Sequence, residues 1–151
     1  MKKSMTNPIA NVCPESCVSP CSVTLFVFMV TCLVYWLMSV WPNPARDSHR
    51  IARLLIDKGH DVVPVNPRAR EVLDRVCYPS LRDVPGPIEM VDVFRRSEHV
   101  AEVVEQAIEK GAKIVWTQLG VGDERAAARA EAAGMMVVMN RCPAIEYRRL
   151  F

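Results

Sequence analysis

The stretch Val62-Val63-Pro64-Val65-Asn66-Pro67-Arg68 carries the pattern that decides the fold class. An apolar run that ends in Asn-Pro and then a basic residue is typical of a buried parallel strand that delivers a polar loop to one edge of a sheet. Open α/β sheets bind their ligands at that edge. The stretch therefore predicts both a strand and a ligand-facing loop.

The same pattern recurs along the chain. Residues 88–95, 113–120 and 135–140 are short, rich in Val, Ile or Met, and followed by polar loops. The stretches between them carry apolar residues at spacings of three and four, which is typical of strand–helix–strand units. A chain of 151 residues with 50% hydrophobic composition can bury one domain core. We predict an α/β domain with a doubly wound, mostly parallel sheet and helices on both faces.

The charge balance argues against one class of partner. The formal net charge is +2 at pH 7, and the basic residues form no long run. Nucleic-acid binding usually needs a basic patch or stripe, so we expect no nucleic-acid partner.

The N-terminal part differs in composition from the rest. Residues 1–33 form an apolar, Cys-containing leader that is predicted to be irregular or helical, and the α/β domain covers residues 34–151. The twenty residues from Ser22 to Trp41 contain no charge, Pro or Gly, which is about the length that crosses a bilayer. Two interpretations stay open. Either this run anchors the protein in a membrane with the domain in the cytoplasm, or residues 34–41 form the first strand of a cytoplasmic protein.

The six cysteines do not predict a metal site. Cys13, Cys17 and Cys21 are regularly spaced, but prolines interrupt this segment and no His lies nearby to complete a zinc set. Cys77 and Cys142 lie in the α/β half of what reads as an intracellular protein, so we expect free thiols there.

The helix predicted from Asp47 or Ser48 to about Lys58 offers an anion site at its start. Backbone N–H groups and the positive end of the helix dipole face outward there, and Ser48 and His49 could add donors. The alternative is that Ser48 is only a cap and His49 only a surface residue.

Three further predictions concern the later loops. Residues 68–75 read as a short charged helix or turn, and Asp123 reads as the cap of a helix over residues 124–133. Right-handed crossovers between parallel strands place all the exit loops on one edge.

Six ordered blocks carry a resemblance to a known family. They are Ser48-His49-Arg50-Ile51-Ala52, Val63-Pro64-Val65-Asn66-Pro67-Arg68, Cys77-Tyr78-Pro79-Ser80-Leu81, Asp92-Val93-Phe94-Arg95-Arg96, Trp116-x-Gln118-x-Gly120-Val121 and Asn140-Arg141-Cys142. Over residues 42–151 the chain resembles the small stand-alone CoA-binding proteins, which are related to the CoA-binding domain of the succinyl-CoA synthetase alpha subunit. The resemblance implies a Rossmann-like fold with CoA or an acyl-CoA lying across the exit loops.

The resemblance also implies roles for individual residues. Ser48 and the helix after it, with His49, match the position that receives the pyrophosphate, and Asn66 and Arg68 match the loop that meets the ribose and its 3′-phosphate. The remaining matches are Phe94 and Arg95 beside the adenine and phosphates, and Gln118, Gly120, Val121, Asn140 and Cys142 facing the pantetheine arm.

The chain departs from the family at its first strand. The family opens with a strand of the type Ile-Ala-Val-Val-Gly-Leu-Ser, whose Gly and Ser form the phosphate loop, whereas residues 35–41 here contain no glycine. A side chain in that place crowds the approach of a pyrophosphate to the backbone. One explanation is a reading-frame error upstream of Pro42, and sequencing the locus tests it.

Two classes of function follow. The first is a CoA or acyl-CoA binding module without catalysis of its own. The second is an enzyme that acts on a CoA thioester or uses a nicotinamide dinucleotide, but the chain has no Gly-x-Gly-x-x-Gly and no convincing nucleophile with an adjacent base. The sequence favours binding without chemistry and without a metal.

Overall fold

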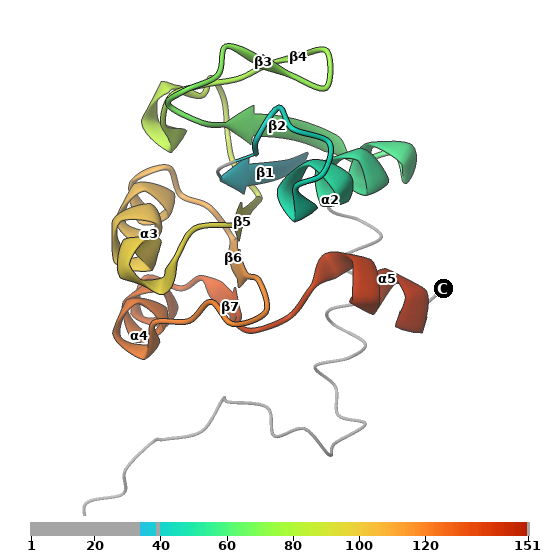
Figure 1. The fold of residues 1–151 in the computed structure, drawn as a ribbon. Coiled ribbons are helices and arrows are strands. Elements are labelled where there is room, and N and C mark those ends of the chain that lie inside the picture. Colours follow the sequence, from blue (N-terminus) through green and yellow to red (C-terminus); the bar gives the residue numbers. More distant parts are fainter. Residues whose placement is uncertain (1–33, 39, 151) are drawn as a thin grey trace, which may run out of the picture. The chain divides into compact units, whose positions relative to one another are not determined.

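The computed structural model describes residues 34–38 and 40–150. These residues form a five-stranded parallel sheet with helices on both faces (Figure 1). The α/β class, the parallel sheet and the two helical layers are as predicted. The strands are β1 (Val34–Met38), β2 (Asp61–Val65), β5 (Met90–Val93), β6 (Ile114–Thr117) and β7 (Met136–Val138).

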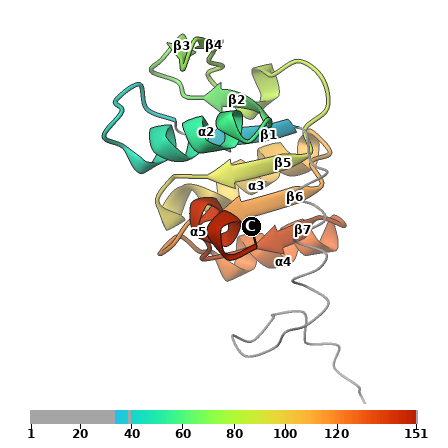
Figure 2. The ribbon, with the colours of Figure 1, turned by 90° about the vertical axis from the view of Figure 1, so that its right-hand side faces the viewer.

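The four α-helices of the described part lie in two layers. On one face are α2 (Asp47–Asp57) and α5 (Pro143–Leu150), and on the other are α3 (Val100–Glu109) and α4 (Glu124–Ala132) (Figures 1 and 2). Short 3-10 turns, η1 (Leu81–Asp83) and η2 (Ser97–His99), precede β5 and α3.

The strand order β2-β1-β5-β6-β7 reverses direction at β1. The chain moves outward from β1 to β2, then crosses back to build β5, β6 and β7 on the other side. In Figure 2 the strand arrows run in the same direction, so their carboxyl ends meet at one edge. Ligands of open α/β sheets bind at such an edge, beside the point where the order reverses. We call the loops after the five strands, residues 40–46, 66–70, 94–97, 118–122 and 139–142, the carboxyl edge.

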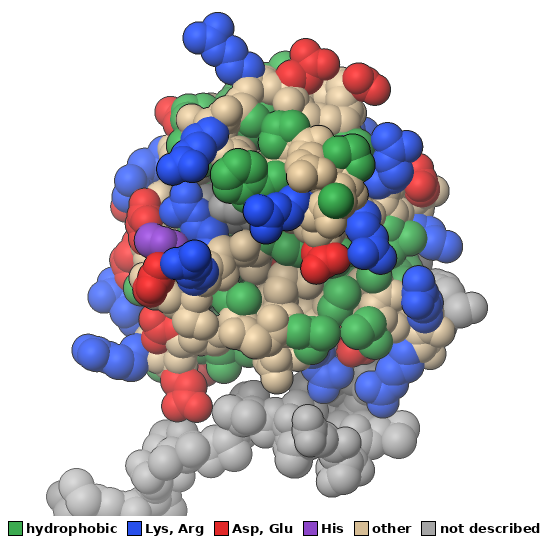
Figure 3. All heavy atoms as spheres, in the orientation of Figure 1, with side chains coloured by type: hydrophobic (Ala, Val, Ile, Leu, Met, Phe, Trp, Pro, Cys, Tyr) green, Lys and Arg blue, Asp and Glu red, His purple; other side chains and the backbone are tan. Residues whose placement is uncertain are grey.

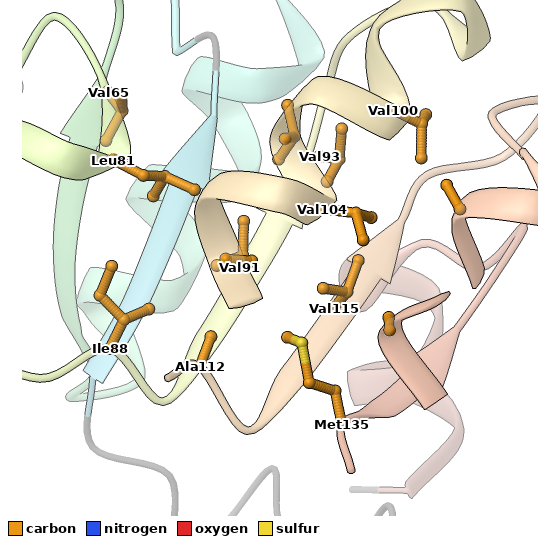
Figure 4. Packing of buried hydrophobic residues seen from close by; sticks show 14 of the residues in the cluster. Val65, Leu81, Ile88, Val91, Val93, Val100, Val104, Ala112, Val115 and Met135 are labelled. Carbon is orange, nitrogen blue, oxygen red and sulfur yellow. The ribbon is translucent and has the colours of Figure 1, made fainter. Parts of the chain in front are cut away.

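The main core lies between the sheet and the layer of α3 and α4. Val91 and Val93 of β5 and Val115 of β6 point toward α3, which contributes Val100 and Val104 (Figure 4). All four residues of β5 and of β6 are buried, which explains their nearly continuous apolar sequences. The ionisable exception is Asp92, which is fully buried on the central strand β5.

One local prediction was wrong. Residues 68–75 were predicted as a helix or turn, but β3 (Glu71–Val72) and β4 (Arg75–Val76) form an antiparallel hairpin. The connecting residues Leu73 and Asp74 have φ of 55° and 58°, as a two-residue hairpin turn requires. Such turns usually contain Gly or Asn, so the pair Leu73-Asp74 gave no sequence signal for a hairpin.

The apolar N-terminal run contributes a strand to the sheet. Residues 34–38 form β1, which pairs along its length with β2 and over four residues with β5, and Val40 is fully buried. No helix within the described ranges is long and apolar enough to cross a membrane. The predictions for residues 1–33, including Cys13, Cys17 and Cys21, concern a segment outside the described residues.

Candidate functional site

Buried polar side chains gather at the carboxyl edge, at the ends of β5 and β6 that lead to it, and at the first turn of α2 beside it. Burying a polar group is costly unless it is hydrogen-bonded, so such a concentration indicates a functional reason. The members are 8% exposed or less: Ser48, His49, Asn66, Asp92, Thr117 and Gln118.

The start of α2 differs from the predicted cap. Arg46 is the N-cap residue and makes no side-chain cap, so Asp47 and Ser48 were the wrong candidates. Ser48 instead lies inside the first turn, where its Oγ accepts from Trp41 N–H at 3.4 Å and fixes the loop after β1. His49 N–H donates to the Arg46 carbonyl at 3.1 Å. The N–H groups of Asp47 and Ser48 keep their ability to hold an anion, because no described side chain caps them.

His49 is also not the surface residue that one interpretation proposed. Its side chain is 8% exposed, in the same turn as Ser48. Asp47 is exposed and lies 3.3 Å from Arg50, so one negative charge flanks this helix start.

Asn66 joins two loops of the edge. Its Nδ2 donates to the Val40 carbonyl at 2.9 Å, and its Oδ1 accepts from Arg68 N–H at 2.9 Å. Both ends of the amide are used within the protein, so Asn66 shapes the loop after β2. Arg68 itself is exposed, and its guanidinium forms no hydrogen bond or ion pair with a described residue, which leaves that group available to a phosphate.

Cys77 lies behind this loop. Its Sγ approaches the Asn66 carbonyl at 3.8 Å, and burial raises the pKa of the thiol. Both Cys77 and Cys142 are free thiols, as predicted.

The loop after β5 is tied to α3 and to the neighbouring loop. Arg95 lies 3.6 Å from Glu102 of α3 and its side chain is 24% exposed, so α3 shares this guanidinium with any ligand. Phe94 is half-buried beside it. Ser97 Oγ accepts from Gly122 N–H at 3.1 Å, which links the loops after β5 and β6.

The loops after β6 and β7 line a shallow, open pocket of about 390 Å³. Gly120 N–H donates to Asn140 Oδ1 at 2.8 Å, and Asn140 N–H donates to Thr117 Oγ1 at 3.2 Å. Gly120, Val121 and Asn140, which were all predicted as site residues, therefore lie together at this pocket. The pocket is lined by Gly120, Val121, Gly122, Asp123, Glu124, Met139 and Asn140.

Cys142 has a structural role in the described part. Its carbonyl accepts the first backbone hydrogen bonds of α5, from Ile145 and Glu146 N–H, and its half-buried side chain does not line the pocket. The structure therefore separates Cys142 from Gly120, Val121 and Asn140.

Asp92 of β5 and Thr117 of β6 are buried polar residues beside the edge that were not among the predicted site residues. Gln118 Nε2 donates to Asp92 Oδ1 at 2.6 Å, and Asp92 Oδ2 has no partner among the described residues. Burial raises the pKa of Asp92 to about 8, although hydrogen bonds from Gln118 and Val93 N–H lower it. The carboxyl group is therefore mostly protonated at neutral pH. The sequence signal that could have identified Asp92 is a single acidic residue within the apolar strand Met90–Val93.

The electrostatics of the edge suit an anion. Figure 3 views the molecule from the carboxyl ends of the strands and shows Lys and Arg side chains spread over this face between hydrophobic patches. The exposed guanidinium of Arg68 and the uncapped start of α2 belong to the same edge.

A parallel sheet with a reversal at β1 and a polar carboxyl edge makes this a Rossmann-like α/β protein. Residues 37–148 match the CoA binding domain family, and the chain belongs to that family.

Individual relatives agree with this assignment. The chain is 37% identical over 100 residues to the uncharacterized protein YneT of Bacillus subtilis, which covers 66% of this chain and 74% of YneT. A hypothetical protein from Pyrococcus horikoshii has a similar structure, with a TM-score of 0.84, 37% identity and coverage of 98% of this chain and 99% of the other. A match of 36% identity over 52 residues to an ADP-forming acetate–CoA ligase of Archaeoglobus fulgidus covers 34% of this chain and 8% of that enzyme.

Proposed function

We propose that the chain is a CoA or acyl-CoA binding module without catalysis of its own. The observation that carries the proposal is the uncapped start of α2 at the point where the strand order reverses. Backbone N–H groups and the helix dipole favour a pyrophosphate there, in the position that the family uses. The exposed Arg68 on the next loop would meet the 3′-phosphate.

The pantetheine arm would run from α2 across the ends of β5 and β6. Neighbouring strands lie about 4.8 Å apart, so β6 is roughly 10 Å from β1 along the edge. An arm laid in this direction reaches Gln118 first and then the loops that carry Gly120, Val121 and Asn140. The pocket at these loops would take the thiol end or a short acyl group.

The absence of catalysis is part of the proposal. A covalent mechanism needs a nucleophile within hydrogen-bond reach of a base. In the described part of the chain, neither the Cys77 nor the Cys142 thiol is hydrogen-bonded to a His or a carboxylate. The alternative, an enzyme that acts on a CoA thioester or a nicotinamide dinucleotide, would show turnover of those compounds by the purified chain.

Calorimetric titration of the full chain with CoA tests the proposal. We expect binding, and we expect Asp47→Asn to tighten it, because the substitution removes a negative charge beside the pyrophosphate. The matched control is Asp57→Asn at the other end of α2, which should leave the affinity unchanged. The gain at Asp47 should shrink with added salt. A chain that does not bind CoA would refute the proposal. Equal effects of Asp47→Asn and Asp57→Asn on the affinity would show that the pyrophosphate does not lie at the start of α2.

We also propose a cytoplasmic location. Residues 34–38 form the strand β1 between β2 and β5, and a membrane helix from Ser22 to Trp41 would take them out of the sheet. Carbonate extraction of cells that express the full chain should release it into the supernatant. Retention in the membrane pellet would favour the anchored alternative.

A further inference from the structure

The buried Asp92 has no role in the function proposed so far, although its hydrogen-bond partner Gln118 lies on the proposed path of the pantetheine arm. We propose that Asp92 is a positioning residue that holds the Gln118 amide with its Oε1 toward the carboxyl edge, where it accepts a hydrogen bond from an amide N–H of the pantetheine arm. This inference rests on the proposed binding of CoA. It identifies the part of the ligand that the centre of the edge recognises.

The placement of Asp92 is the first support. It occupies the third position of β5, in register with Leu37 of β1 and Trp116 of β6, so strands flank it on both sides. Its neighbours Val91 and Val93 point into the core under α3, so Asp92 faces the opposite layer of α2 and α5. Gln118 follows Trp116 by two residues and reaches the same face just beyond the end of β6.

The orientation of the amide is the second support. A glutamine amide has one donor end and one acceptor end. The donor end points inward, with Nε2 at 2.6 Å from Asp92 Oδ1. No described residue donates to Oε1, and Gln118 retains 8% exposure whereas Asp92 has none. A ligand can therefore touch only the outer part of this pair, which presents an acceptor.

The chemistry of the ligand fits that acceptor. The pantetheine arm carries two amide N–H groups, whereas the nucleotide half of CoA is expected at α2 and Arg68. An unpaired acceptor at a buried position is costly, so a site that offers one discriminates in favour of ligands with a donor. The ligand class is thus a nucleotide that bears an amide-containing arm.

The protonation state of Asp92 determines which orientations the Gln118 amide can adopt. The ionised carboxylate only accepts, so Gln118 must then donate inward and present Oε1 outward. The protonated acid can also donate to Oε1 after a flip of the amide, so the outward acceptor is then less strictly fixed. Ionisation therefore strengthens the selection for an N–H donor.

The other ionisable groups near this layer do not bond to Asp92. β1 carries no acidic or basic residue. The remaining candidates are His49 in the first turn of α2, Arg95 beside Glu102, Cys142, the hydrogen-bonded pair of His60 and Tyr147, and the pair formed by Arg141 and Glu146 at 3.1 Å. Within the described residues, Asp92 is hydrogen-bonded by Gln118 and by Val93 N–H.

Calorimetry with CoA and with 3′,5′-ADP, which lacks the pantetheine arm, tests the inference. Asp92→Leu removes the acceptor that holds Gln118, and we expect it to weaken CoA about fivefold to tenfold, the value of one hydrogen bond. Binding of 3′,5′-ADP should change less than about twofold. In a chain that already carries Gln118→Met, Asp92→Leu should cause no further loss of CoA affinity, because Asp92 acts through Gln118.

Two controls separate positioning from general damage. Gln106→Met removes another buried glutamine, on α3, whose Oε1 accepts from Leu81 N–H at 3.1 Å, and it should leave both ligands unaffected. Asp92→Asn keeps the shape but cannot ionise. The ratio of CoA to 3′,5′-ADP affinity should rise from pH 6.5 to 9 in the wild-type chain, because burial raises the pKa of Asp92 to about 8, and it should stay flat in this variant.

The outcomes are distinguishable. Equal loss of CoA and 3′,5′-ADP in Asp92→Leu, or additive effects in the double variant, would overturn the inference while leaving CoA binding intact. A wild-type chain that binds neither ligand would overturn the proposed function and this inference with it. If near-UV circular dichroism shows that Asp92→Leu is unfolded, the Asp92→Asn variant is used to test the inference instead. A CoA to 3′,5′-ADP affinity ratio that does not change with pH in Asp92→Asn supports the inference, and a ratio that rises with pH as in the wild-type chain overturns it.

Discussion

Arg68 shows how one residue can be placed from sequence logic. Proline cannot continue a strand ladder, so Pro67 ends the path of β2 and the next side chain turns outward. The structure agrees, because Arg68 is exposed and its guanidinium has no partner in the described part of the chain. A phosphate monoester would gain a charge-assisted, bidentate contact there.

Arg68→Ala should weaken CoA by about 1.5–3 kcal/mol, the usual range for a hydrogen bond to a charged group. Dephospho-CoA, which lacks the 3′-phosphate, should lose far less. Calorimetry with both ligands makes the comparison, and Arg53→Ala on the exposed side of α2 is the matched control. Equal losses for the two ligands would show that Arg68 does not contact the 3′-phosphate.

Asp92 makes the stability of the fold depend on pH. Its pKa is raised from 3.8 to about 8, so between these values the unfolded chain releases a proton that the folded chain keeps. The free energy of unfolding then falls as pH rises, by up to about 1.4 kcal/mol per pH unit, and levels off above the folded pKa. Asp92→Asn should remove this slope.

Urea denaturation of both chains between pH 5 and 9 measures the difference. Other titrating groups contribute equally to the two chains, so the difference isolates Asp92. Parallel profiles would mean that the carboxyl group is ionised in the folded state at neutral pH.

At the scale of elements, α4 depends on its first residue. Asp123 Oδ1 accepts from Arg125 N–H at 3.0 Å and from Ala126 N–H at 3.1 Å, as the sequence predicted for an N-cap. Asp123→Ala should lower the free energy of unfolding by about 0.5–2 kcal/mol, whereas Asp123→Asn should keep most of it. Chemical denaturation compares them, and an Asn variant as unstable as the Ala variant would mean that charge rather than capping matters.

The two helix starts explain what the sequence could and could not predict. Asp123 caps α4 through local geometry, which a sequence pattern contains. The start of α2 was misjudged because Ser48 bonds to Trp41 N–H in the preceding loop. That contact depends on how the β1 loop folds back, which no local pattern contains.

Periodicity predicted the helices and strands well, but the pairing of side chains depends on the sheet. The buried runs gave β2, β5, β6 and β7 because strands covered on both faces must be apolar. The bond between Asp92 and Gln118 joins residues 26 apart, and it exists because β5 and β6 are neighbours in the sheet. The role of Asn66 between two loops was hidden for the same reason.

At the scale of the whole molecule, β1 is both the strand at which the order of the sheet reverses and the place where the chain departs from its family. The glycine of the family pattern falls on Ser39, which lies outside the described residues. We expect the consequence to be steric, because a side chain in that position would crowd the approach of a pyrophosphate to the backbone. The native chain should therefore bind CoA more weakly than a chain of the same fold that has a glycine in this position.

Replacing residues 35–41 with Ile-Ala-Val-Val-Gly-Leu-Ser should tighten CoA, because the strand stays apolar and the glycine opens the approach to the start of α2. The matched control carries Ala at the glycine position and differs from the first chain by one methyl group. Calorimetry on these two chains and the native one gives the comparison. If the Gly and Ala chains bind CoA equally, crowding of the backbone is not what limits the native site, and the pyrophosphate does not lie against this loop.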